Sequence, residues 1–430
     1  MKRVLIITYY WPPSGGGGVQ RWVKFAKYLQ EFNIEPIVLT VDPKLASYAI
    51  IDESMISELP NDIKVFTTKS REPFNIYKKF TAKKEIPFGG FANEERPGIT
   101  QKISRFIRGN FFIPDARIGW NKFAYRKAIE LIEKFDIETV ITSSPPHSTQ
   151  LIGLKLKRDK SINWIADLRD PWTDIYYYNR MYHSPIAKKL DLKKEFDVLN
   201  NADKVIVVSQ SIKSLFASKI TPSQKDKISV ISNGYDSDDF KSNNYNINDR
   251  FTITYTGTLA DNYNIDGFLK ALISVVNKFG ESKIKIQFVG RVTSKYQDII
   301  NKSILKQICS FEGHVAHKAS ISHLKNANAL FLAIPYEPQN EGILTGKLFE
   351  YLAARKPIVG VGPVDGDAAV IINECEAGKM FNYSDVQEIS NYIIELYNRW
   401  TESPKLSLES EVYTNYSRVN LTKKLVTLIQ

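Results

Sequence analysis

The chain alternates between short apolar runs and longer segments in which apolar residues recur at helical spacing. The first run, 4–8, is rich in β-branched residues, a glycine-rich loop at 15–18 follows it, and helical spacing then continues up to a second run at 36–41. This order predicts a strand, a loop, a helix and a strand. The same patterning predicts further strands at 139–142, 163–166 and 204–208, and helices at 124–135 and 188–199.

A second series of the same kind follows a polar stretch at 238–249, which contains four asparagines and no apolar periodicity. It predicts strands at 251–256, 285–289, 329–334 and 357–361, and helices at 267–279 and 346–354. Strands that alternate with helices indicate mostly parallel sheets covered on both faces. The predicted fold class is therefore α/β, with two Rossmann-like domains.

The polar stretch sets the expected domain boundaries. We expect a first domain over 1–237, with a basic segment inserted at about 43–118, and a second domain over 251–405. The apolar positions of 406–430 predict a C-terminal helix that packs back on the first domain. Sheets of this kind bind ligands at the carboxyl ends of their strands, so we expect a cleft between the domains.

The composition is that of a globular protein, with 43% hydrophobic and 24% charged residues in a chain of 430. These values exclude disordered, collagen-like and coiled-coil chains. The two cysteines, Cys309 and Cys375, are too few for a disulfide framework or a Cys-rich zinc site. This low cysteine content favours a reduced, cytoplasmic setting. No apolar run approaches the roughly 18 to 20 residues of a membrane-spanning helix, so we do not expect the protein to cross a membrane.

Basic residues outnumber acidic ones, and the excess lies in the first half of the chain. Residues 1–200 hold 32 basic and 23 acidic side chains, a net charge of +9, whereas 201–430 hold 26 and 24, a net charge of +2. The segment 69–108 combines ten basic and four acidic side chains with six aromatic ones. This mixture fits an anionic membrane surface or acceptor, and it fits a solvated basic loop equally well. Nucleic acid is not an expected partner, because no nucleic-acid-binding signature accompanies the charge.

Five phrases are similar, in the same order, to motifs of glycosyltransferase family 4. They are the strand and loop at 227–236, the glycine turn at 255–259, the strand end at 288–290, the loop at 311–313 and the acidic helix signature at 341–359. The chain thus resembles a retaining sugar transferase of the GT-B fold, in which two Rossmann-like domains face each other across a central cleft. The resemblance implies a nucleotide-diphosphate-sugar donor, no cofactor and no metal.

The resemblance places the donor in the second domain. Glu350 matches the family glutamate that accepts hydrogen bonds from the ribose, and Glu341 resembles the acid that contacts the donor sugar. Eight residues separate these two glutamates where the family has seven, so a neighbour could replace Glu341. Thr345 and Gly346 begin the same helix, where backbone amides and the helix dipole favour a diphosphate, and Lys347 adds a positive charge.

The chain departs from the family at two diphosphate-binding positions. Thr258, after Gly257 of the glycine turn, stands where an arginine is common, and residues 263–264 stand where Lys-Gly is common. Both usual cations are therefore missing. We expect Arg291 and Lys347 to replace them.

Two loops that end strands of the first domain carry the remaining candidates. His147 lies in the loop 143–148, and Arg169 and Asp170 lie in the loop 166–172. Arg169 and Asp170 fit two roles equally well. They could act in catalysis or acceptor binding, or they could form a structural salt bridge.

The glycine loop completes the candidates, because Gly16 and Gly17 precede a helix N-terminus and are expected near the donor phosphate. Retaining transfer in this family is explained by attack on the same face of the sugar, with the leaving phosphate accepting the proton. No protein nucleophile is then required.

Other chemistry-bearing patterns indicate no metal site. The pairs Asp236/Asp238 and Asp365/Asp367 imitate the metal-binding motif of GT-A transferases, but in this context they are predicted to be loop and cap residues. Three histidines lack the ligand spacing of a zinc site and are expected at the surface or against a base: His314, His317 and His323.

The preferred interpretation is a cytoplasmic, metal-independent retaining glycosyltransferase that transfers a sugar to a polysaccharide or lipid-linked oligosaccharide acceptor at the inner face of the membrane. One alternative is a GT-B epimerase of nucleotide sugars, which would use ionisable groups such as His147 or Asp170. The other is a non-catalytic protein that binds sugar nucleotides or acidic polymers.

Overall fold

The structure is a computed structural model, and it describes the whole chain except residues 57, 61, 73–97, 242–247 and 405. Contacts divide the chain into two compact units. The first comprises Met1–Ser232 together with Leu421–Gln430, and the second comprises Asn233–Asn420.

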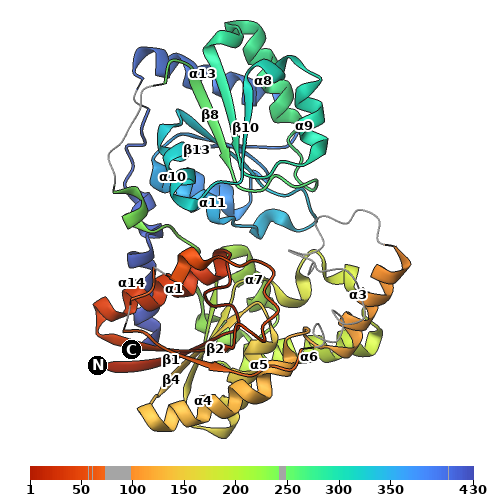
Figure 1. Cartoon of the computed structure of the whole chain (residues 1–430), viewed down its shortest axis with the longest axis vertical. Coiled ribbons are helices and arrows are strands. Elements are labelled where there is room, and N and C mark those ends of the chain that lie inside the picture. The colour runs from red at the N-terminus through yellow and green to blue at the C-terminus, as the bar shows by residue number, and fades with distance from the viewer. Residues whose placement is uncertain (57, 61, 73–97, 242–247, 405) are drawn as a thin grey trace. The chain divides into compact units, whose positions relative to one another are not determined.

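The first unit contains a parallel sheet of seven strands in the order β3-β2-β1-β4-β5-β6-β7 (Figure 1). Its strands are β1 (Lys2–Thr8), β2 (Ile34–Val41), β3 (Lys64–Thr68), β4 (Thr139–Ser144), β5 (Asn163–Leu168), β6 (Lys204–Val207) and β7 (Ile228–Val230). In the register of the sheet, Ile6 of β1 pairs with Val38 of β2 on one side and with Ile141 of β4 on the other. All three side chains are fully buried, which explains why the central strands are nearly continuous apolar runs.

Helices cover both faces of this sheet. They are α1 (Gly17–Leu29), α4 (Asn121–Phe135), α5 (Ser148–Asp159), α6 (Pro185–Asn201), α7 (Gln210–Ser218) and α14 (Arg418–Ile429). Helix α3 (Ile99–Phe111) packs on α6 and on the 3-10 helix Tyr178–Met181. Leu131 of α4 and Ile152 of α5 belong to one buried cluster, and Trp22 of α1 and Leu425 of α14 belong to another. The C-terminal helix, predicted over 406–430, begins only at Arg418.

The second unit contains a parallel sheet of six strands in the order β10-β9-β8-β11-β12-β13. Its strands are β8 (Phe251–Thr256), β9 (Ile284–Val289), β10 (Cys309–Gly313), β11 (Ala329–Ala333), β12 (Ile358–Val361) and β13 (Gly378–Phe381). Its helices are α8 (Asp266–Phe279), α9 (Ser294–Asn301), α10 (His317–Asn326), α11 (Gly346–Ala354), α12 (Asp367–Glu374) and α13 (Val386–Glu402). The predicted α/β class with two Rossmann-like sheets is confirmed.

The strand order determines where each unit can bind a ligand. In both sheets the chain runs outward from a central strand to one edge and then returns to the other side of that strand, so the order reverses between β1 and β4 and between β8 and β11. Loops at the carboxyl ends of such strands diverge and leave a crevice. The loops that carry the candidate residues of the sequence analysis follow β1, β4, β5, β8, β9 and β11.

Candidate functional site

The carboxyl ends of β8 and β9 meet in a pair of glycines. Gly257 has a φ of 92° and Gly290 a φ of 126°. The backbone N–H of Gly257 donates to the carbonyl oxygen of Val289 at 2.8 Å, and a Cβ atom at Gly290 would lie 2.4 Å from the carbonyl oxygen of Gly257. Glycine alone adopts these backbone angles freely and permits so close an approach. The glycine pair therefore allows the two strand ends to approach each other closely.

The N-terminus of α11 lies beside this glycine pair. Thr345 is the N-cap residue, and its side chain makes no capping hydrogen bond. Its Oγ1 is buried and lacks a hydrogen-bond partner among the described residues, while a Cβ at Gly346 would meet no atom within 4 Å. The first amides of a helix have no partner within the helix, and the helix dipole makes this end attractive to anions. The arrangement suits a phosphate group.

Lys347 holds its ammonium group over two aromatic rings at the same helix end. Nζ lies 2.5 Å from Oη of Tyr255, 4.2 Å from the centre of that ring and 5.3 Å from the ring of Tyr263. A Cβ at Gly257 would lie 2.9 Å from Cε of Lys347, so the glycine turn and the lysine are in contact. Burial lowers the pKa of Lys347 to about 7, although the charge of Glu350 opposes this shift. An added anion would favour the charged form.

Glu350 lies one turn further along α11 and is half-buried, with its side chain 24% exposed. Burial raises the pKa of its carboxyl group, and the neighbouring His317 opposes this shift. Nδ1 of His317 lies 4.0 Å from Oε1 of Glu350, and Nε2 of the same ring lies 3.3 Å from Oδ2 of Asp239. The histidine thus connects two carboxylates. This link was not predicted, because no local sequence pattern associates His317 with a glutamate on another helix.

The two remaining candidates of the second unit are exposed. Arg291 directly follows Gly290, and its carbonyl oxygen accepts a hydrogen bond from Leu259 at 2.8 Å. Glu341 lies in a short 3-10 helix, Asn340–Gly342. Among the described residues, the Glu341 carboxylate forms no hydrogen bond or ion pair. The structure therefore brings Gly257, Gly346 and Lys347 together with Glu350, and it does not add Glu341 to this group.

In the first unit, the glycine loop contacts the loop that follows β5. Gly16 has a φ of 108°. A Cβ at Gly18 would lie 2.0 Å from Nη1 of Arg169, whereas a Cβ at Gly17 would meet no atom within 4 Å. Nε of Arg169 donates to the carbonyl oxygen of Ser144 at 3.0 Å. The loops after β1, β4 and β5 therefore meet at the Arg169 guanidinium.

The proposed salt bridge of the β5 loop is not formed. Arg169 donates to backbone carbonyls, and no ion pair joins it to Asp170 within the described part of the chain. Burial raises the pKa of the Asp170 carboxyl group, and the Arg169 charge opposes this shift. Asp170 is therefore a half-buried acid beside a cation.

His147 is held by stacking rather than by hydrogen bonds. Its ring stacks on Trp172 with ring centres 4.7 Å apart, and its Nδ1 is buried with no partner among the described residues. Burial and the charge of Arg169 lower the pKa of His147 to about 3. The imidazole is neutral near pH 7 and is a weak base there.

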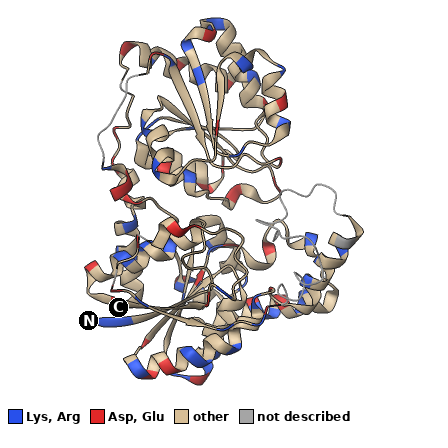
Figure 2. Cartoon of the chain, in the orientation of Figure 1, with Lys and Arg blue, Asp and Glu red and all other residues tan. Residues whose placement is uncertain are grey.

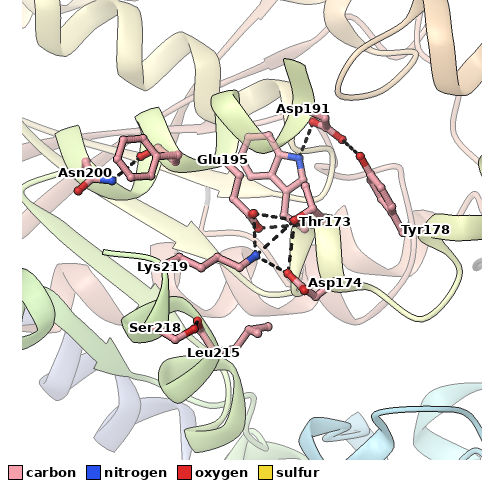
Figure 3. Close-up of polar contacts among 11 residues, drawn as sticks. Thr173, Asp174, Tyr178, Asp191, Glu195, Asn200, Leu215, Ser218 and Lys219 are labelled. Carbon is pink, nitrogen blue, oxygen red and sulfur yellow. Dashed lines mark hydrogen bonds and ion pairs between the residues drawn. The ribbon is translucent and has the colours of Figure 1, made fainter. Parts of the chain in front are cut away.

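A polar cluster fixes the segment that carries Trp172 (Figure 3). Trp172 Nε1 and the hydroxyl of Tyr178 donate to the two carboxylate oxygens of Asp191, at 2.9 and 3.0 Å. Nearby, Lys219 forms ion pairs with Asp174 and with Glu195. Residues 172–178 are thereby joined to α6, and through Trp172 this support reaches His147.

A fully buried ion pair joins α1 to β5 in the first unit. Arg21 of α1 and Asp167 of β5 are both 0% exposed, and their Nη2 and Oδ1 atoms are 3.0 Å apart. Asp167 also accepts hydrogen bonds from Trp22 at 2.9 Å and from Ser143 at 2.8 Å. Arg21 donates in turn to the carbonyl oxygen of Ser232 at 2.7 Å. Sequence analysis did not identify this pair, because an arginine within a helical pattern is usually exposed.

Two features are absent from the part of the chain that the structure describes. No group of three or more histidine, cysteine, aspartate or glutamate residues there could hold a metal ion. No helix there is both long and apolar enough to cross a bilayer.

Each of the two units has a parallel sheet with polar loops at its carboxyl ends, and the second unit adds a helix N-terminus with a cation and a carboxylate. These features are typical of GT-B glycosyltransferases. Residues 15–239 match the family model described as Glycosyltransferase Family 4, and residues 250–399 match the one described as Glycosyl transferases group 1. The chain belongs to glycosyltransferase family 4, and it is a glycosyltransferase of the GT-B fold. No curated protein matches the sequence.

Several solved structures are similar to the chain over its whole length. A glycosyltransferase from Rickettsia africae has a TM-score of 0.61 at 15% identity, over 100% of this chain and 98% of that one. Anabaena HepE, solved in complex with UDP-glucose, has a TM-score of 0.61 at 12% identity, over 99% of each chain. A TarM variant from S. aureus, solved with fondaparinux, α-GlcNAc-glycerol and UDP, has a TM-score of 0.61 at 12% identity over 100% of each chain. At these identities the similarity establishes the fold.

Proposed function

We propose that this glycosyltransferase moves a sugar, with retention of configuration, from a nucleotide-diphosphate donor to a glycan or lipid-linked glycan. The observation that carries the proposal is the arrangement on α11, where the open helix N-terminus, Lys347 and Glu350 follow one another within little more than one turn. To bind a nucleotide diphosphate, a protein needs a site that accepts the anionic diphosphate. It also needs a hydrogen-bond acceptor that the ribose hydroxyls can reach. This helix offers both.

The donor would bind with its diphosphate at the amides of Thr345 and Gly346 and against Lys347. Charge-assisted hydrogen bonds from these groups would stabilise the charge that develops on the leaving diphosphate. Glu350 would accept hydrogen bonds from the ribose hydroxyls, with His317 favouring its ionised form. Arg291, exposed beside the glycine pair, is the proposed second cation.

The chemical step needs no protein nucleophile in this proposal. The bond from the sugar to the diphosphate breaks, the acceptor oxygen forms its bond on the same face, and its proton passes to the leaving phosphate oxygen. The low pKa of His147 supports this route, because a general base works best when its pKa is near the operating pH. Arg169 and Asp170 would position the acceptor, and Glu341 would contact the donor sugar.

The similar structures suggest which donors to test first. HepE was solved with UDP-glucose and TarM with UDP, so UDP-linked sugars should be tested first as donors. We propose further that the reaction takes place in the cytoplasm, at the inner face of the membrane, with no metal ion and no cofactor.

Incubation of the purified chain with candidate donors and acceptors tests the proposal, with NMR of the product to establish its anomeric configuration. We expect release of the nucleoside diphosphate and a glycoside with the configuration of the donor. Glu350→Gln should reduce product formation, and Glu388→Gln, a change on an exposed residue of α13, should not. Isomerised donor without a glycoside would establish the epimerase, and bound but unconsumed donor would establish the binding protein.

A further inference from the structure

Helix α3 differs from an ordinary surface helix, because it buries an arginine and exposes large apolar side chains. Arg105 is only 4% exposed, and Gly109 is buried. The large apolar side chains face outward instead, with these exposed fractions: Ile99 78%, Ile103 54%, Phe106 46%, Ile107 44% and Phe111 73%. Their spacing places them on one face of the helix. A helix that only covered a core would bury this face.

Helix α6 lies against α3, and polar contacts fix the connection. Asn110 of α3 accepts a hydrogen bond from the backbone of Ser184 at 2.7 Å and donates to the carbonyl oxygen of Tyr182 at 3.1 Å. A Cβ at Gly109 would lie 2.5 Å from the carbonyl oxygen of Met181, so α3 packs closely on the segment that leads into α6. The two helices form one structural element.

Helix α6 also exposes large apolar side chains, in two pairs whose members are four residues apart. Its exposed apolar residues are Ile186 74%, Leu190 48%, Leu192 41% and Phe196 52%. The exposed charged residues on the two helices are all lysines: Lys102, Lys188, Lys189 and Lys193. Asp191 and Glu195, by contrast, are each 1% exposed. Within the described residues of both helices, every exposed residue except Asn201 is apolar or a lysine.

We propose that these outward apolar and lysine side chains of α3 and α6, the α3–α6 surface, dock on an anionic phospholipid bilayer. Exposed apolar area of this extent indicates an interaction partner. Lysines around apolar side chains fit a membrane with anionic headgroups, since the apolar groups enter the interface while the ammonium groups meet phosphate. Figure 2 shows lysines and arginines along both helices.

The inference rests on the proposed function, which sets the reaction at the inner face of a membrane, and it adds which surface of the chain would hold the enzyme there. It also extends the membrane interpretation of the segment 69–108. Residues 73–97 of that segment lie outside the described part of the chain, and α6 was not part of the earlier interpretation.

Flotation of the full chain with vesicles tests the α3–α6 surface without any donor or acceptor. We expect binding to an equal mixture of phosphatidylcholine and phosphatidylglycerol, weaker binding to phosphatidylcholine alone, and loss of the difference at high salt. Ile103→Ser with Phe106→Ser should weaken binding to mixed vesicles about tenfold or more. Lys188→Gln with Lys189→Gln should weaken it by about fivefold for each lysine, and only on anionic vesicles.

Matched variants in the second unit provide the control. Ile299 and Val370 are 41% and 49% exposed, and their change to serine should leave vesicle binding intact. The proposal would be overturned if the serine substitutions in the second unit weakened vesicle binding as much as Ile103→Ser with Phe106→Ser. It would also be overturned if the unaltered chain did not bind vesicles. Sedimentation showing that Ile103→Ser with Phe106→Ser dissociates a dimer would overturn it as well, because the surface would then join two copies. Donor binding, measured separately, shows whether the proposed function stands when vesicle binding fails.

Discussion

At the scale of single residues, the proposed function makes the charge state of Lys347 central to donor binding. The two cations that the family commonly places near the diphosphate are missing, so in this proposal the Lys347 ammonium group would carry more of the charge. Its burial over the rings of Tyr255 and Tyr263 lowers the pKa to about 7. In the free protein a large fraction of the lysine is therefore neutral just above pH 7.

Donor affinity should depend on this ionisation. An anionic diphosphate stabilises protonated Lys347, so affinity is highest below the pKa of the free protein, about 7, and falls as the pH rises through it. The fall should approach tenfold per pH unit until the pKa of the complex is reached. Calorimetric titration of a nucleotide sugar across this range measures it. Lys347→Arg should bind with a flat pH profile, and a profile that keeps its slope in this variant would assign the ionisation elsewhere.

Adjacent glycines of the first unit offer a matched pair of changes. Gly18→Ala would place a Cβ 2.0 Å from Nη1 of Arg169, and Gly17→Ala would place one in open space. The guanidinium is the end of a flexible side chain, so the fold should survive while Arg169 moves. We expect turnover to fall about a hundredfold in Gly18→Ala, as for other small misplacements near a reaction. Gly17→Ala tests the role expected for Gly17 near the donor phosphate, and full activity of Gly18→Ala would show that the position of Arg169 is unimportant.

At the scale of elements, burial on both faces made the strands predictable. The strand predicted at 251–256 is β8, and the helix predicted at 346–354 is α11. The edge strands β3, β10 and β13 were not predicted, whereas the edge strand β7 lies within the strand and loop expected at 227–236. Strand β3 lies in the segment 43–118 that was expected to be an insertion; it is partly exposed, and its sequence, Lys-Val-Phe-Thr-Thr, lacks a continuous apolar run. Glu350 and Lys347 were proposed through a motif, whereas Arg21 and Asp167 were not, since each contacts a residue far away in the sequence.

Loss of the buried ion pair between Arg21 and Asp167 should destabilise the protein. Asp167→Ala would leave the Arg21 guanidinium buried without its carboxylate and would remove the acceptor of Trp22 and Ser143. We expect a loss of about 3–5 kcal/mol in the free energy of unfolding. Urea denaturation measures the loss. Asp159→Ala removes the exposed ion pair with Lys155 and should leave the midpoint unchanged; an equal shift in both variants would contradict the account.

At the scale of the whole molecule, the last ten residues belong to the first unit although they follow the second. Leu421, Leu425 and Ile429 of α14 pack in the same buried cluster as Val4 and Ile6 of β1. The chain therefore closes the core of its first unit only when its C-terminus is in place.

Truncating this contact should destabilise the protein without affecting the donor site. Leu425 is 0% exposed, and Leu425→Ala should cost about 2–5 kcal/mol. The exposed Lys424 on the same helix provides the control, since Lys424→Ala removes no core contact. Donor affinity measured well below the unfolding temperature should be the same in both variants. A normal midpoint for Leu425→Ala would mean that α14 does not stabilise the first unit.

The central claim, that the second unit binds a nucleotide diphosphate sugar through α11, is tested most directly by thermal unfolding with a panel of UDP-, GDP- and dTDP-linked sugars. A ligand that binds only the folded state stabilises it by about 2.7 kcal/mol at a hundredfold excess over its Kd. We predict that one base family raises the unfolding temperature by several degrees, and that Glu350→Gln loses this shift while Glu388→Gln keeps it. No shift with any donor, or a full shift in Glu350→Gln, would contradict the account.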